Sequence, residues 1–123
     1  MLVYTVLATE LLEPRETAAL CGPLAIVEAN LREDVVEAAM RGAGLTIARK
    51  DVVGTQWREH EEERTQPVSQ ALLQLARLRR RREEIVERYG GEEFEIAQAS
   101  LHWLAYLLLG KLRPTVYVLE HAR

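Results

Sequence analysis

The sequence has a single cysteine, no secretory signal and no long apolar run, and each absence excludes a class of protein. Because Cys21 is the one cysteine among 123 residues, no disulfide can form within the chain. With His60 and His121, it makes no metal-ligand spacing. The longest apolar stretch, residues 103–110, is far shorter than the roughly 20 residues that a membrane-spanning helix needs. We therefore expect a soluble, cytoplasmic protein with no metal site.

A strong excess of one charge is also lacking. The chain has 16 basic and 19 acidic residues, so its net charge is -3. This charge gives no general attraction to nucleic acid or anionic membranes. The hydrophobic content of 48% is typical of globular proteins. A chain of this length forms one domain at most and buries roughly two-thirds of its unfolded surface.

Strand and helix patterns alternate along residues 1–123, which we treat as a single α/β domain. Apolar, β-branched and aromatic runs predict three strands, over residues 1–8, 45–53 and 114–121. Helical periodicity between start and stop signals predicts about four helices, over residues 14–22, 31–42, 67–89 and 92–109. Pro14 begins the first helix, and Asn30 with Glu33 forms a capping-box-like start for the second.

This order of elements predicts the second half of an open, doubly wound sheet without its first half. Such folds bind their nucleotide or cofactor at the turn after the first strand. That turn is missing, because the sequence opens directly in the strand 1–8. The segment 57–67 is too polar for a core position, and we interpret Glu61 to Glu63 within it as a solvated acidic loop or a helix start.

Three short motifs carry a family resemblance through their order and spacing. Residues 43–45 (AGL) lead into the second strand, residues 57–59 (WRE) follow it, and residues 110–112 (GKL) lead into the last strand. Over nearly its whole length the chain resembles the C-terminal half of class I S-adenosylmethionine-dependent methyltransferases that act on small molecules. The resemblance implies a partial Rossmann-like sheet whose last strand is antiparallel and inserts between the other two. It also implies a small-molecule methyl acceptor.

The family's cofactor-binding motifs have no counterpart in this sequence. Its glycine-rich loop, its acidic ribose ligand and its fourth-strand segment would all lie upstream of Met1. The nearest candidate, Gly42 to Gly44, precedes a strand and is typical of a helix stop. We therefore predict no cofactor-binding residue in this chain and expect it not to bind S-adenosylmethionine alone. The catalytic residue is unknown.

Seven residues are candidates for contacts with the acceptor. They are Glu10, Trp57, Arg58, Glu59, His102, Trp103 and Tyr106. Trp57 and Arg58 follow the carboxyl end of a strand, where α/β folds place ligands, and an aromatic beside a guanidinium suits a planar or anionic substrate. His102 could accept a proton from the acceptor, although a core histidine bonded to a backbone carbonyl is the alternative.

Five arginines lie within residues 77–82. They favour ion pairing with Glu83, Glu84 and Glu87 on a solvated helix face, and nucleic-acid binding is the alternative.

The strand Leu2 to Leu7 has no lysine, proline or inward charge to protect an exposed edge. We expect the chain to self-associate through it or to bind a separately encoded N-terminal half. The alternative to a methyltransferase half is a truncated, non-catalytic interaction module.

Overall fold

The computed structural model describes residues 1–122, which form three strands and six α-helices. In chain order the elements are β1 (Leu2–Ala8), α1 (Pro14–Cys21), the short 3-10 helix η1 (Glu28–Leu31), α2 (Glu33–Gly42), β2 (Leu45–Val52), α3 (Gln56–Thr65), α4 (Pro67–Arg80), α5 (Arg82–Tyr89), α6 (Gly91–Leu108) and β3 (Leu112–His121). The α/β class and the approximate positions of all three strands are confirmed.

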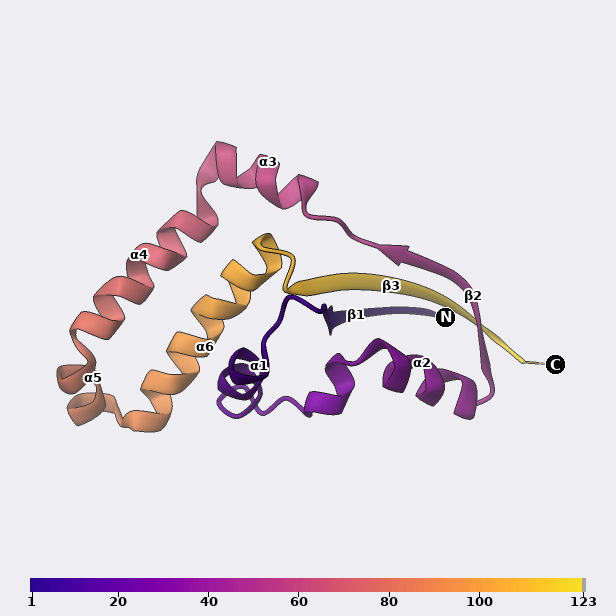
Figure 1. The fold of residues 1–123 in the computed structure, drawn as a ribbon, viewed down its shortest axis with the longest axis horizontal. Coiled ribbons are helices and arrows are strands. Elements are labelled where there is room, and N and C mark those ends of the chain that lie inside the picture. The colour runs from indigo at the N-terminus through magenta and orange to yellow at the C-terminus, as the bar shows by residue number, and fades with distance from the viewer. Residues whose placement is uncertain (123) are drawn as a thin grey trace.

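The sheet has the order β1-β3-β2, and β3 is antiparallel to both of its neighbours. The expected insertion of the last strand between the first two is therefore confirmed. Because β1 and β2 both oppose β3, they run parallel to one another, and their carboxyl ends point toward the helices α3 and α6 (Figure 1). This end of the sheet is where α/β folds place their ligands.

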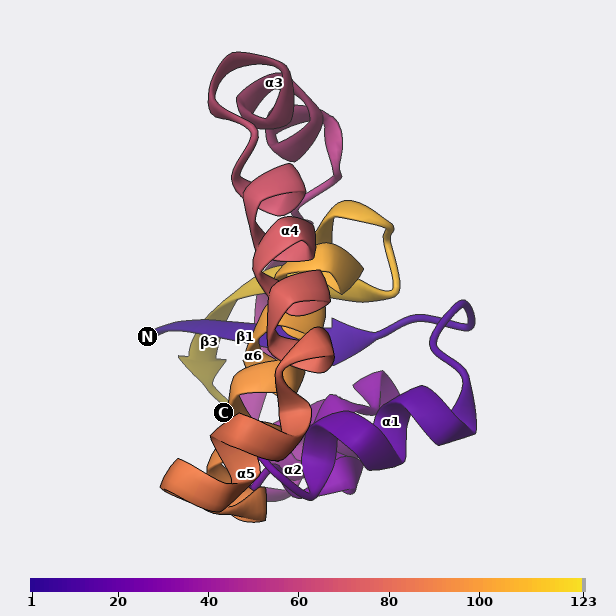
Figure 2. The same cartoon turned by 90° about the vertical axis from the view of Figure 1, so that its left-hand side faces the viewer.

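Helices cover the two faces of the sheet unequally. Helix α2 covers one face, where Met40 packs against Tyr117 and Leu119 of β3. The other face is covered only toward its helical end, by a cluster of buried residues from the α1 region, α6 and β3: Leu12, Leu20, Ala99, Leu107 and Leu112. The outer part stays open, since Leu2 is 69% and Tyr4 59% exposed. Figure 2, seen from the helical end, shows α4, α5 and α6 in front of the sheet, and α1 and α2 on one side of it.

Two helix predictions need correction. The single helix expected over 67–89 is two helices, because the chain breaks at Arg81, which has φ -101° and ψ 23°. The break lets α5, with its half-buried Ile85 and Val86, fold back against α6. In addition, the polar segment after β2 is a full helix, α3, and none of its residues is buried. The described residues thus hold six α-helices rather than about four.

Two boundary predictions were also wrong. Asn30 lies inside η1 and does not cap α2, which begins two residues later than expected after the extended residue Arg32. Pro114 lies within β3, which begins at Leu112 rather than at the proline. The proline is tolerated because the carbonyl oxygen of Pro114 accepts a bond from the Val53 amide, 2.9 Å away, just beyond the end of β2, where no further pairing needs its missing donor.

Within the described part of the chain, no helix combines the length and apolar character needed to cross a bilayer.

Candidate functional site

A cavity of about 100 Å³ lies at the carboxyl ends of β1 and β2. Thr9 comes from the end of β1, and residues 52–55 come from the end of β2. The first turn of α3 supplies Trp57 and Arg58, and the end of α6 with the start of β3 supplies the remaining wall. Most of that wall is apolar, through residues such as Leu107 and Leu112. The cavity therefore occupies the position predicted for a ligand by the strand directions.

Hydrogen bonds hold the loops around this cavity together. The Thr9 hydroxyl donates to the Gly110 carbonyl oxygen at 2.7 Å, and the Thr9 amide donates to the Lys111 carbonyl oxygen at 3.0 Å. Gly110 has φ +74°, the left-handed conformation that ends α6 and that glycine adopts without strain. The end of β1 and the turn between α6 and β3 are thus fixed relative to one another.

Trp57 and Arg58 are the two predicted site residues that line the cavity. The guanidinium carbon of Arg58 lies 4.4 Å from the centroid of the Trp57 ring, a cation–π distance. The Nε–H group of Arg58 is buried and has no hydrogen-bond acceptor, and among residues 1–122 no carboxylate oxygen lies within 4.0 Å of its guanidinium. Trp57 is 49% exposed. The pair combines an uncompensated cation with an accessible aromatic face.

Arg113 of β3 is also a lining residue of the cavity, but its guanidinium is directed to Glu33 of α2. Its Nη2 atom donates to the Glu33 Oε2 atom at 2.6 Å, whereas its Nε–H group is buried without an acceptor. Glu33 also pairs with Lys50 of β2, whose Nζ atom donates to Glu37 Oε2 at 3.0 Å. The Lys50 hydrogen bond lowers the pKa of Glu33. Helix α2 therefore positions Arg113 through this ion network.

Sequence reasoning missed Arg113 and the ion network that holds it. The network joins Glu33 and Glu37 of α2 to Lys50 of β2 and Arg113 of β3. The signals available were a lysine in a half-buried strand and two glutamates at (i, i+4) on the helix before it. Neither signal fixes which face of the strand the lysine occupies, so the contact could not be assigned.

Glu10 and Glu59 are placed near the cavity in sequence but do not line it. Glu10 is exposed in the turn after β1, and Glu59 is exposed on α3 one residue after Arg58. Neither carboxylate has an ion-pair partner among the described residues. A role for either in binding the acceptor stays a prediction.

His102, Trp103 and Tyr106 lie farther back on α6 and do not line the cavity either. Trp103 and Tyr106 pack against the core cluster that contains Leu20 and Leu112. The rings of His102 and Tyr106 stack with centroids 5.6 Å apart. Burial, and to a lesser degree the charge of Arg79, lowers the pKa of His102. Burial and the charge of Glu16 raise the pKa of Tyr106. The structure thus separates these three residues from Trp57 and Arg58.

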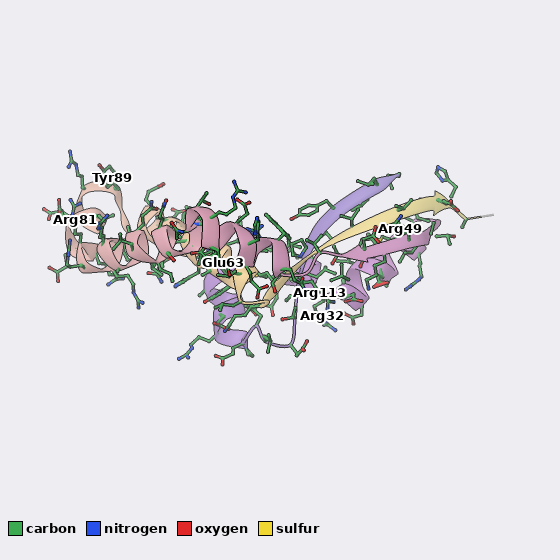
Figure 3. All side chains as sticks on the ribbon, turned by 90° about the horizontal axis from the view of Figure 1, so that it is seen from above. Arg32, Arg49, Glu63, Arg81, Tyr89 and Arg113 are labelled. Carbon is green, nitrogen blue, oxygen red and sulfur yellow. The ribbon has the colours of Figure 1, made fainter. Side chains whose placement is uncertain are left out.

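The arginine run lies at the junction of α4 and α5, far from the cavity. Figure 3 shows Arg81 at the end of the helical half opposite to Arg113. Arg81 makes two bonds to Glu84, at 2.8 and 3.0 Å, and the guanidinium carbon of Arg82 lies 5.3 Å from the Phe94 ring centroid. Among residues 1–122, pairing of the run with Glu83 or Glu87 is not observed, so the expected ion pairing is confirmed for Glu84 alone.

Changing the run should have little effect on stability. We expect replacement of Arg79, Arg80 and Arg81 by glutamine to change the free energy of unfolding by no more than about 1 kcal/mol, because exposed ion pairs contribute little. Arg81 and Glu84 are both more than half exposed. Urea titration followed by circular dichroism measures the change. If the variant also loses a measurable affinity for RNA, the nucleic-acid alternative is supported instead.

Comparisons with known proteins place no further constraint on the site. No protein-family model matches this chain, and no curated protein matches it either. Within residues 1–122, no group of three or more His, Cys, Asp or Glu side chains is arranged to hold a metal ion.

Proposed function

We propose that this chain is the acceptor-side half of a cytoplasmic, S-adenosylmethionine-dependent methyltransferase that acts on a small molecule. The observation that carries the proposal is the sheet order β1-β3-β2, with an antiparallel strand inserted between two parallel ones. The cavity at the carboxyl ends of those parallel strands supports it. In this proposal the sheet is the C-terminal part of a Rossmann-like fold, and Trp57 and Arg58 hold the methyl acceptor.

The described residues do not fit the cofactor itself. The glycines nearest to a loop motif, Gly42 and Gly44, end α2 and precede β2, so they do not open a helix after a strand. Gly44 has φ +80°, as expected of a residue that terminates a helix. The proposal therefore requires an N-terminal half that brings the cofactor site. This chain's part is to bind and orient the acceptor, and orientation supplies a large share of enzymatic rate.

The free edge of β1 is the surface where that N-terminal half would dock. Among residues 1–122, β1 pairs with β3 on one side only. Its open side continues into an apolar groove lined by Val3 of β1 and by Val35 and Ala39 of α2. The other edge, β2, is protected by its bulge and by Arg49, Lys50 and Asp51. A second copy of this chain would occupy the β1 edge when the N-terminal half is absent.

Calorimetric titration with S-adenosylmethionine tests the proposal. We expect no saturable binding by the isolated chain tighter than about 100 μM, or roughly -5.5 kcal/mol. We expect binding once the chain is fused, before Met1, to a methyltransferase N-terminal half that ends at its fourth strand. Tight binding by the isolated chain would contradict the missing site. A folded fusion that fails to bind would favour the non-catalytic interaction module.

The DNA upstream of the Met1 codon gives a second, independent test. A reading frame that continues upstream into a strand and a GxGxG loop supports the methyltransferase. An in-frame stop codon directly upstream supports the interaction module, whose binding surface would be the same β1 edge.

A further inference from the structure

We propose that the cavity binds the carboxylate group of a planar aromatic acid. The assignment of this acid as the methyl acceptor rests on the proposed function, whereas the binding itself does not. The guanidinium of Arg58 carries the proposal, because Arg58 lines the cavity and its guanidinium makes no hydrogen bond or ion pair with residues 1–122.

Unpartnered buried donors are costly, and those on charged groups more so. A guanidinium that lines a cavity and has no acceptor in the protein is suited to an acceptor supplied by a ligand. Glu33 compensates the charge of Arg113, but no described carboxylate lies within ion-pair distance of Arg58. The cavity therefore carries the net charge of one guanidinium. A single negative charge with two coplanar oxygens matches that group, because carboxylates pair with guanidinium in a bidentate manner.

The surroundings favour a carboxylate over a phosphate. Most of the cavity wall is apolar, so it offers few donors to the many acceptor oxygens of a dianion. The Glu33 carboxylate, 2.6 Å from Arg113, would also repel a second negative charge. A monoanion of small size is the ligand that this combination suits.

Trp57 indicates what is attached to the carboxylate. Its side chain is half exposed although it lines the cavity, so part of the indole is available to a ligand that extends outward. Planar aromatic rings stack on indole with a gain beyond simple burial. An aryl carboxylate can place its charge beside Arg58 and its ring beside Trp57.

Benzoate and its neutral analogue benzamide are suitable probes. We expect benzoate to quench or shift the tryptophan fluorescence of the chain saturably, and benzamide to bind at least about tenfold more weakly, since it lacks the charge. Arg58→Gln should weaken benzoate binding by about tenfold or more. The substitution removes no protein hydrogen bond from the Nε atom, so the variant should remain folded, which circular dichroism verifies.

Arg64→Gln is the matched control on the same helix. Arg64 is 59% exposed and pairs with Glu61 away from the cavity wall, so its loss should leave benzoate affinity unchanged. Equal affinity for benzoate and benzamide, or an unchanged affinity in Arg58→Gln, would overturn the inference. So would displacement of benzoate by inorganic phosphate at equal concentration. Because these titrations contain no methyl donor, their failure would leave the proposed function to be tested by the fusion.

Discussion

A proline at position 4 is expected to convert a self-associating chain into a monomer. The bonds at both ends of the β1–β3 ladder involve odd-numbered residues of β1: Met1 exchanges two with Leu119, at 2.8 and 2.9 Å, and the Thr9 amide donates to Lys111. Because such bonds alternate along an antiparallel pair, the amide of Tyr4 faces the free edge. Tyr4→Pro thus removes an edge donor while the β1–β3 ladder stays intact.

Sedimentation velocity over a range of concentrations measures the effect. The unsubstituted chain should form dimers or larger assemblies, and Tyr4→Pro should shift the distribution toward monomers. Thr5→Pro is the control at the neighbouring position, because its amide faces β3 opposite Thr115 and its loss should unfold the sheet. A monomeric parent chain with rapid amide exchange along Leu2–Ala8 and slow exchange elsewhere would contradict edge pairing.

The sheet could be predicted from the sequence because its strands carry local signals. Each strand is a run of β-branched and aromatic residues with a helix or a glycine turn beside it. The central place of β3 was predicted through the motifs at residues 43–45, 57–59 and 110–112, not through any property of β3 itself. Tyr117, fully buried in the structure, agrees with that central place.

The helical half was predicted less well, since its boundaries depend on tertiary packing. Nothing in the polar composition of α3 requires a helix. The start of α3 at Gln56 is separated from the end of β2 by residues 53–55. The break at Arg81 has no glycine or proline to mark it. It follows from the need to bring α5 against α6, a contact that no local pattern encodes.

The sequence predicted Trp57 and Arg58 of the candidate site but not Arg113 and its ion network. Trp57 and Arg58 stood out because they follow a strand, and they line the cavity. Arg113 and Lys50 were missed, and the placement of Lys50 depends on a β-bulge between Ile47 and Arg49. The bulge reverses the alternation of β2, so that Lys50 faces α2 on the same side as Ile47. Without the bulge, simple alternation would place Lys50 on the opposite face.

Lys50→Met is expected to lower the free energy of unfolding by about 2 kcal/mol, because a hydrogen-bonded charge is removed from a partly buried network. The methionine stem still packs near the Tyr117 ring, 5.7 Å from the ammonium in the native chain, so the loss reports the charge. Glu33 and Glu37 would then face one another without a cation. Thermal unfolding should show a fall in Tm of roughly 5–10 °C.

Arg49→Met is the matched control, since Arg49 pairs with Asp51 two residues along β2 but is 70% exposed. Its loss should cost less than about 1 kcal/mol. The pKa of Glu33 is lowered by Lys50, so the contribution of this pair is complete above about pH 4.5 and disappears as the pH falls through the lowered pKa. The difference in free energy of unfolding between the parent chain and Lys50→Met should therefore become smaller in acid. The corresponding difference for Arg49→Met should stay small at every pH. Equal losses in both variants would show that the network does not hold α2 to the sheet, and Arg113 would then lack the support that places it at the cavity.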